Sequence, residues 1–251
     1  MPADSQFKMD AHCFLGVDGC RAGWFFVAFD GGGRAAFGIA DTIHDLWARY
    51  HHAAAILIDI PIGLVSGHAA GRPCDAAARR LLKPQRHSAI FSPPCRQALA
   101  ASDYATACRI NQQTCGRKLS IQTWNIVPRI REVDAFLQRT PAARGIVRET
   151  HPEICFWALA GGRPMAHSKK SADGRQQRLD LVERWYPRSD QLFNSAMRHY
   201  PRRQLAPDDI LDALANAVTA VRLKSDGATL PAEPDVDRCG LPMEMLYARF
   251  D

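Results

Sequence analysis

The sequence lacks the features that define several large protein classes. No run of apolar residues approaches the ~18 that a transmembrane helix needs, so we expect no membrane span. The opening stretch, MPADSQFKMDAHC, is polar and carries charges of both signs, so we expect no signal peptide. None of the eight cysteines has the two-residue spacing of a zinc knuckle or a redox motif. These absences favour a cytoplasmic protein with reduced thiols, with structural disulfides as the weaker alternative.

The sequence also lacks internal repeats, low-complexity tracts and a strong charge bias. Its 251 residues are enough for one large domain or for one domain with an insertion. The net charge of +6 permits a nucleic-acid partner without requiring one, because many proteins carry a mild basic excess. We expect a single domain over residues 1–251, of which the first ten or so residues form a disordered lead-in.

Short apolar runs near the N-terminus predict an antiparallel meander of three strands. The runs are residues 13–19, 23–29 and 34–40. A strong turn signal, Asp30–Gly33, separates the last two. Asp41 and Thr42 then indicate the start of a short helix, and residues 54–60 form an unbroken apolar run typical of a buried parallel strand. The order predicts an α/β fold with a mixed sheet flanked by helices.

Residues 64–145 contain no convincing strand, and we interpret them as a helical insertion. The helices expected there are residues 74–82, 104–115 and 120–139. Pro128 should kink or split the longest of these. The last strand is expected at residues 145–151, and a helix from Asp208 to about Leu223 follows Pro207.

Four aspartates are informative, because acids are poor strand residues and unfavourable in a core unless something compensates them. Asp18 ends the first strand and Asp59 ends the buried strand, so both could point to one place. Asp209 and Asp212 are three apart on a helix and share a face. Converging carboxylates would repel one another, and Mg²⁺ or Mn²⁺, which prefer oxygen ligands, would relieve the repulsion. Two such ions can promote phosphodiester hydrolysis.

Each of these acids also has a structural explanation. Asp18 could start a turn, and Asp59 could cap a loop. Asp209 could complement the helix dipole in the first turn after Pro207. The joint pattern, more than any single residue, favours a metal site.

Other polar residues are candidates for chemistry or for substrate contact. Glu149, His151 and Glu153 alternate along the expected strand and therefore share a face. Glu149 is a candidate metal ligand or base, and His151 a proton relay or substrate contact, with a structural polar cluster as the alternative. The candidates for binding phosphate are Lys83, Arg96 and Gln122. For the lysine, a solvated surface position is the favoured alternative.

The order of strands and acids is similar to that of the ribonuclease H-like superfamily, and the last helix is closest to that of the Holliday-junction resolvases. This resemblance implies that Asp18, Asp59, Asp209 and Asp212 hold the metal, although the family usually has glutamate where this chain has Asp59. Nearly the whole chain resembles the family called "domain of unknown function 429", described as a predicted ribonuclease H-like nuclease. The blocks that carry this likeness are GVDGCRAGW (16–24), IDIPIGL (58–64), CDAAARRLL (74–82), FSPPCR (91–96), RETHPEICFWAL (148–159) and DDILDALANAVTA (208–220).

The acids and the resemblance together predict a divalent-metal-dependent nuclease, in which Glu149 assists proton transfer. One alternative is a metal-dependent hydrolase of a nucleotide or a small phosphorylated metabolite, if the insertion closes over the acids. Another is a non-catalytic binding module whose acids tie loops together. The basic segment 163–203 could line a path for a polyanion or form an ordinary solvated face. The choice between DNA and RNA stays open, as does the oligomeric state, for which the last helix or the inserted helices offer a dimer surface.

Overall fold

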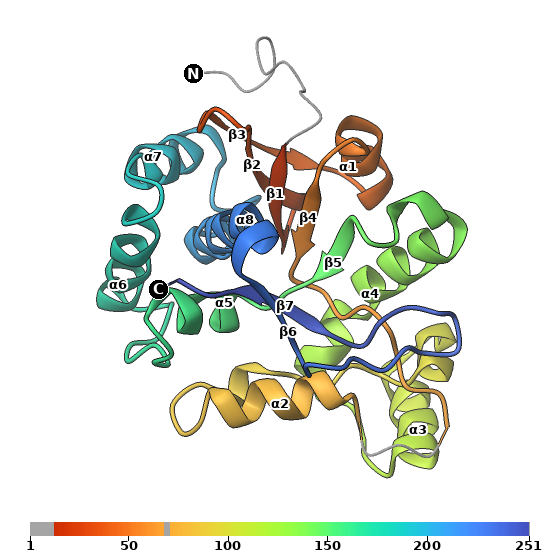
Figure 1. Cartoon of the computed structure of the whole chain (residues 1–251). Helices are drawn as coiled ribbons and strands as arrows, with labels where there is room; N and C mark the ends of the chain where they lie inside the picture. The colour runs from red at the N-terminus through yellow and green to blue at the C-terminus, as the bar shows by residue number, and fades with distance from the viewer. Residues whose placement is uncertain (1–12, 68–70, 251) are drawn as a thin grey trace.

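The computed structural model describes residues 13–67 and 71–250, which contain a mixed five-stranded sheet at the centre of the fold (Figure 1). The strands are β1 (Phe14–Cys20), β2 (Gly23–Phe29), β3 (Ala35–Ala40), β4 (Ala55–Ile58) and β5 (Val147–Glu149). They lie in the order β3-β2-β1-β4-β5. The β1–β2 and β2–β3 pairs are antiparallel, whereas β1–β4 and β4–β5 are parallel. The predicted meander, buried parallel strand and mixed α/β sheet are confirmed. The expected lead-in lies outside the described residues.

Helices cover both faces of the sheet. One face carries α1 (Ile43–Tyr50) and α4 (Ile121–Arg139). The other carries α5 (Pro152–Leu159), α6 (Ala172–Glu183), α7 (Ser189–His199) and α8 (Pro207–Asp226). Side chains of β2 alternate between the two layers, so that Trp24 and Phe26 face the first and Phe25 and Val27 the second. Both faces are therefore buried, which explains why β2 is apolar throughout.

The helix α8 lies directly on the central strand β1. A Cβ atom added at Gly16 would lie 2.1 Å from the Ala217 nitrogen and 2.2 Å from the Ala213 oxygen. The Asn216 side chain donates a hydrogen bond of 3.1 Å to the Val17 carbonyl. Small residues on both elements thus allow close approach. Because β1 residues alternate, Asp18 shares the face of Gly16 and points toward α8.

Between β4 and β5 the described residues form only helices and loops. These helices are α2 (Pro73–Leu81), η1 (His87–Ala89), η2 (Arg96–Ala100), α3 (Tyr104–Cys115), α4 and η3 (Pro141–Ala143). The expected helices at 74–82, 104–115 and 120–139 are confirmed within one or two residues. The helix α4 runs through Pro128 as one element, so the expected split does not occur. In Figure 1, α2 and α3 lie beyond the ends of β4 and β5, while α4 lies to the right of β5, on the side of α1.

Two sequence expectations about the C-terminal half are wrong. The strand at 145–151 is not the last, because β6 (Gly227–Leu230) and β7 (Met245–Ala248) pair antiparallel in the region expected to be loops. The alternation of Glu149, His151 and Glu153 also fails, because α5 begins at Pro152 and places Glu153 on a helix. Pro152 provides a preorganised first helical residue, and His151 is the N-cap.

The helices of residues 13–67 and 71–250 include none that is long and apolar enough to cross a membrane. All eight cysteines lie within these residues, and each is a free thiol. Most are buried, where thiols pack as small apolar side chains.

Candidate functional site

Asp18 and Asp59 lie side by side at one end of the sheet. Val17 of β1 pairs with Ile58 of β4 in parallel register, and the Asp59 amide donates to the Val17 carbonyl at 3.1 Å. The next residue of each strand is an aspartate, so both carboxylates leave the sheet at the same edge. Asp18 is 8% exposed, and its carboxylate accepts the Gly19 amide at 2.8 Å.

The helix α8 supplies two more carboxylates from its first turns. Asp212 is 1% exposed and faces the sheet. Asp209 is half-buried and accepts the Ala206 amide at 2.9 Å, so it caps the helix that Pro207 begins. The structural role considered for Asp209 is thus present in the fold, alongside its position near the other acids.

The pKa values of these acids report a shared, unfavourable environment. Burial raises the pKa of Asp18 well above its usual value, and the charges of Asp59, Asp212 and Asp209 raise it further. Burial raises the pKa of Asp212 to about 6, although Lys169 opposes the shift. Burial also raises the pKa of Asp209 to about 6, against the opposing hydrogen bond from Ala206. Raised pKa values of this kind mark a cluster whose negative charge is incompletely compensated.

Two cations near the acids were missed by the sequence reasoning. Lys169, from the loop between α5 and α6, places its Nζ 2.5 Å from Asp212 Oδ2 and 3.8 Å from Asp208 Oδ2. Arg129 of α4 stacks over the Trp24 ring at 4.8 Å and donates to the Cys20 carbonyl. Neither belongs to a motif, because each reaches the site only through the packing of distant segments.

The acids open onto a cleft of about 310 Å³. Asp18, Asp59 and Asp212 line it together with Lys169 and Arg129. Its apolar lining residues are Ile60, Ala89, Ile90, Phe91, Ile126 and Met245. The cleft thus lies between the edge of the sheet and the helical segment that separates β4 from β5.

His151 and Glu153 also line the cleft. The Glu153 amide donates to His151 Nδ1 at 3.2 Å, which implies that the proton of the neutral ring is on Nε2. Glu153 Oε1 accepts from the fully buried Arg178 at 2.6 Å. Its buried Oε2 has no hydrogen-bond partner among the described residues.

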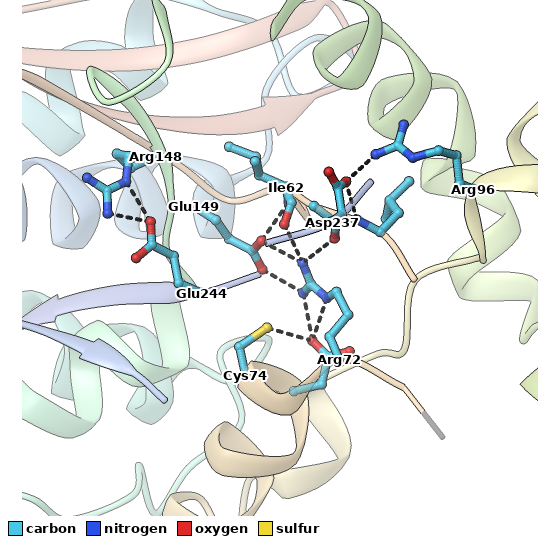
Figure 2. A network of polar contacts seen from close by, with 11 residues as sticks. Ile62, Arg72, Cys74, Arg96, Arg148, Glu149, Asp237 and Glu244 are labelled. Carbon is cyan, nitrogen blue, oxygen red and sulfur yellow. Dashed lines mark hydrogen bonds and ion pairs between the residues drawn. The ribbon is translucent and has the colours of Figure 1, made fainter. Parts of the chain in front are cut away.

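Glu149, expected to assist chemistry, is instead held by Arg72 (Figure 2). Its two carboxylate oxygens each accept from the Arg72 guanidinium at 2.7 Å, and Oε2 also accepts the Ile62 amide at 2.6 Å. Asp75 accepts from the same guanidinium at 2.6 Å. Burial raises the pKa of Glu149 to about 7, although Arg72 opposes the shift. Glu149 borders the cleft but directs both oxygens into this network.

Cys74, Asp75 and Glu149 form a buried group that could hold a metal ion, since one ligand atom of each lies within 4.8 Å of the others. Arg72 already provides a cation to both carboxylates, so a metal would have to displace it (Figure 2). Burial also raises the pKa of the Cys74 thiol, which disfavours the thiolate that binds metal. The geometry allows a metal, whereas the charges of the group are already balanced by arginine.

The three residues expected to bind phosphate do not line this cleft. Arg96 forms ion pairs with Asp134, at 2.6 Å, and with Asp237. Lys83 is exposed after α2, and Gln122 is exposed in the first turn of α4. The structure therefore brings together Asp18, Asp59, Asp209 and Asp212, and it places these three elsewhere.

Comparisons with known proteins place the chain in a family. No curated protein and no solved structure matches it. A family model described as "Protein of unknown function (DUF429)" matches residues 16–236, which include all four clustered aspartates. The chain therefore belongs to the DUF429 family.

Proposed function

We propose that this protein is a divalent-metal-dependent phosphodiesterase of the ribonuclease H-like type, acting on nucleic acid. The observation that carries the proposal is the convergence of Asp18, Asp59, Asp209 and Asp212 from two adjacent parallel strands and one helix. Their arrangement on β1, β4 and α8 agrees with the resemblance of the sequence to that superfamily. The mixed sheet order β3-β2-β1-β4-β5 agrees with it as well.

The residues of the cleft fit a divalent cation such as Mg²⁺ or Mn²⁺. Asp18, Asp59 and Asp212 line the cleft and Asp209 lies near Asp18, and their carboxylates are the oxygen ligands that these ions prefer. Lys169 forms an ion pair with Asp212 and opposes the repulsion on Asp18 only in part, since the pKa of Asp18 stays raised. Glu153 also lines the cleft, and its buried, unpartnered Oε2 is a further oxygen that a cation or its water would satisfy. A bound cation would supply Lewis-acid stabilisation of charge on a phosphodiester.

The remaining residues of the cleft have roles that follow from their contacts. Lys169 and Arg129 are the cations nearest the acids and are suited to hold a phosphate oxygen. His151, with Nδ1 occupied by a backbone amide, presents Nε2 for hydrogen bonding or proton transfer. Glu149 accepts hydrogen bonds from Arg72 and from the Ile62 amide, so its role is to position the residues that form this wall of the cleft.

The small volume of the cleft favours a second candidate function, hydrolysis of a nucleotide or a small phosphorylated metabolite. Its volume of about 310 Å³ is at the lower end of small-molecule sites. Phe91 and Ile126, from the helical segment, form part of its apolar lining. The two candidates share the metal site and differ in whether the substrate extends beyond the cleft.

The test is calorimetric titration of Mn²⁺ into the native protein and into the Asp18→Asn/Asp59→Asn double variant. A matched control is Asp41→Asn/Asp235→Asn, which neutralises two exposed acids away from the cleft. We expect binding by the native protein and the control, and a loss of at least tenfold in affinity in the double variant. Hydrolysis of labelled single-stranded and duplex DNA and RNA, and of mononucleotides, is then measured with Mn²⁺.

Degradation of polymers by the native protein and the control, but not by the double variant, would support the nuclease proposal. Hydrolysis of mononucleotides alone would favour the second candidate. Absence of Mn²⁺ binding by the native protein, or equal binding by the double variant, would contradict both.

A further inference from the structure

A second hollow adjoins the acidic cleft. It has a volume of about 270 Å³ and lies between α2, the loop after η1 and the start of α4. Ile90 and Phe91 line both the cleft and this hollow, so the two meet at these residues. The other residues that line the hollow are Arg79, Ser92, Asn111, Arg117, Lys118, Leu119, Ser120 and Thr123. We call it the basic pocket, because three of its residues are cations and none is an acid.

The three cations differ in whether their side chains already have hydrogen-bond partners. Arg79 is fixed, with Nε donating to the Ile90 carbonyl at 3.1 Å and an NH2 group donating to Ser92 Oγ at 2.6 Å. The side chains of Arg117 and Lys118 form no hydrogen bond or ion pair with any described residue. Most arginines of this protein are paired with acids or carbonyls, so two adjacent unpaired cations on one wall create a local excess of positive charge. Such a pocket attracts an anion, and a phosphate matches the guanidinium geometry.

Phe91 stands between the two hollows. It is 45% exposed, which is unusual for a large apolar side chain next to charged groups. An exposed aromatic ring between cationic side chains and a candidate cleavage site is the arrangement by which proteins bind single strands, with bases stacked on rings and phosphates held by cations. A stacked duplex does not offer a base face to such a ring.

We propose that the substrate is a single-stranded nucleic acid that crosses Phe91. One phosphate occupies the basic pocket at Arg117 and Lys118, a neighbouring base stacks on Phe91, and the strand continues into the acidic cleft. This inference rests on the proposed function, and it assigns a polymer to the cleft because only a strand has one phosphate for the basic pocket and another for the acidic cleft. Recognition through stacking and phosphate contacts carries little base specificity.

The experiment is fluorescence anisotropy of labelled dT and rU oligonucleotides with the native protein in EDTA, so that binding is measured without metal and without hydrolysis. The variants are Arg117→Gln/Lys118→Gln, Phe91→Ala and Phe91→Tyr. The matched control is Arg202→Gln/Arg203→Gln, which removes two exposed positive charges that line neither hollow.

We expect Arg117→Gln/Lys118→Gln to weaken binding at least tenfold and to reduce the slope of log K against log salt by ~0.7, as the loss of one single-strand phosphate contact predicts. Phe91→Ala should weaken binding at least fivefold without changing the slope, and Phe91→Tyr should retain native affinity because its ring still stacks. The oligonucleotide affinity of the control should stay within about twofold of that of the native protein.

Three outcomes would overturn the inference: no binding of either oligonucleotide by the native protein, equal losses in the control and the basic-pocket variant, or unchanged binding in Phe91→Ala. A fourth test repeats the assay with a labelled duplex, and tighter binding of the duplex than of the single strands would also overturn the inference. Tighter binding of dT than of rU would identify the substrate as DNA, and tighter binding of rU would identify it as RNA. This assay measures binding and not hydrolysis. Failure of the proposed catalytic function would therefore leave the binding result intact, and failure of the binding proposal would leave the catalytic proposal intact.

Discussion

Asp18 experiences the repulsion of three other carboxylates while buried between β1 and α8. Its folded-state pKa is raised above the unfolded value, so the folded protein holds this proton more tightly than the unfolded chain does. Stability therefore falls as pH rises through the interval between the two pKa values, and the loss persists above it. Asp18 reduces the stability of the metal-free protein at neutral pH.

Replacing Asp18 with asparagine should raise the Tm of the metal-free protein at pH 8. The amide side chain keeps an oxygen to accept the Gly19 backbone N–H but removes the charge. We expect a rise of ~2–4 °C, which about 1 kcal/mol produces in a chain of this size, and a gain that disappears toward pH 4. Scanning calorimetry in EDTA at pH 8 and at pH 4 measures the rise in Tm and its disappearance.

Asp30 is the matched control for this prediction. Burial opposes ionisation there, but hydrogen bonds from Arg34 and Gly32 outweigh it and lower the pKa of Asp30. Asp30→Asn should therefore lower the Tm at pH 8. A fall in Tm for both variants would show that Asp18 is stabilised in its charged form and would contradict our description of the cluster.

At the scale of elements, the contact of β1 with α8 determines whether the four acids meet. A methyl group at Gly16 would meet backbone atoms of Ala213 and Ala217, which cannot rotate away as a side chain could. Gly16→Ala should therefore destabilise the protein by at least ~2 kcal/mol in denaturant unfolding and should weaken Mn²⁺ binding, because α8 must move away from Asp18. Gly32→Ala, in an exposed turn, should change stability by less than ~1 kcal/mol. Equal effects at the two positions would contradict this account.

The elements that sequence patterns predicted well are those whose signals are local. The strands β1 to β4 are apolar runs separated by turn residues, and α3 and α4 have caps and helical periodicity. The short strands β6 and β7 were missed because four residues give little periodicity and because β7 depends on distant partners, such as the bridge of Leu246 to Thr150. The start of α5 was missed because Glu149, His151 and Glu153 were expected to alternate along one strand, whereas Pro152 is a first helical residue.

The candidate site likewise contains residues that the sequence indicates and residues that only the fold reveals. Aspartates at strand ends and on a helix face conflict with burial, so the sequence alone indicates them. Lys169 was hidden in a basic segment where nothing distinguishes it from its neighbours. The pairing of Glu149 with Arg72 joins residues 77 positions apart, and it could not be deduced without the fold.

At the scale of the whole molecule, Arg72 ties the helical segment to the sheet (Figure 2). Its guanidinium contacts Glu149 of β5, Asp75 of α2 and the Ile62 carbonyl. Replacing Arg72 with methionine leaves two buried carboxylates unpaired, so we expect a loss of ~3–5 kcal/mol at pH 8 by urea unfolding. Because the pKa of Glu149 is already raised and would rise further without Arg72, protonation should reduce this loss at pH 5.5.

The control is Arg34→Met, which removes an arginine whose side chain is 60% exposed. Its loss should be less than ~1 kcal/mol, because the arginine is solvated and Asp30 keeps the hydrogen bonds from the Gly32 and Arg34 backbone amides. A loss in Arg72→Met that is small, or that grows as pH falls, would show that the network does not join the two parts of the molecule.

The distance along the chain between β1 and α8 has a consequence for synthesis. Asp18 is made about 190 residues before Asp209, which at ribosomal rates is roughly 10–40 s. During that interval the nascent protein can pair β1 with β2 and β4, yet the face of β1 that α8 covers, with Gly16 and Asp18 on it, stays open. If the proposed activity is correct, a ribosome-bound fragment cannot cleave the message or any other strand beside it, since the carboxylates of α8 arrive last. Catalytic competence is thus coupled to the order of translation by the topology of the fold.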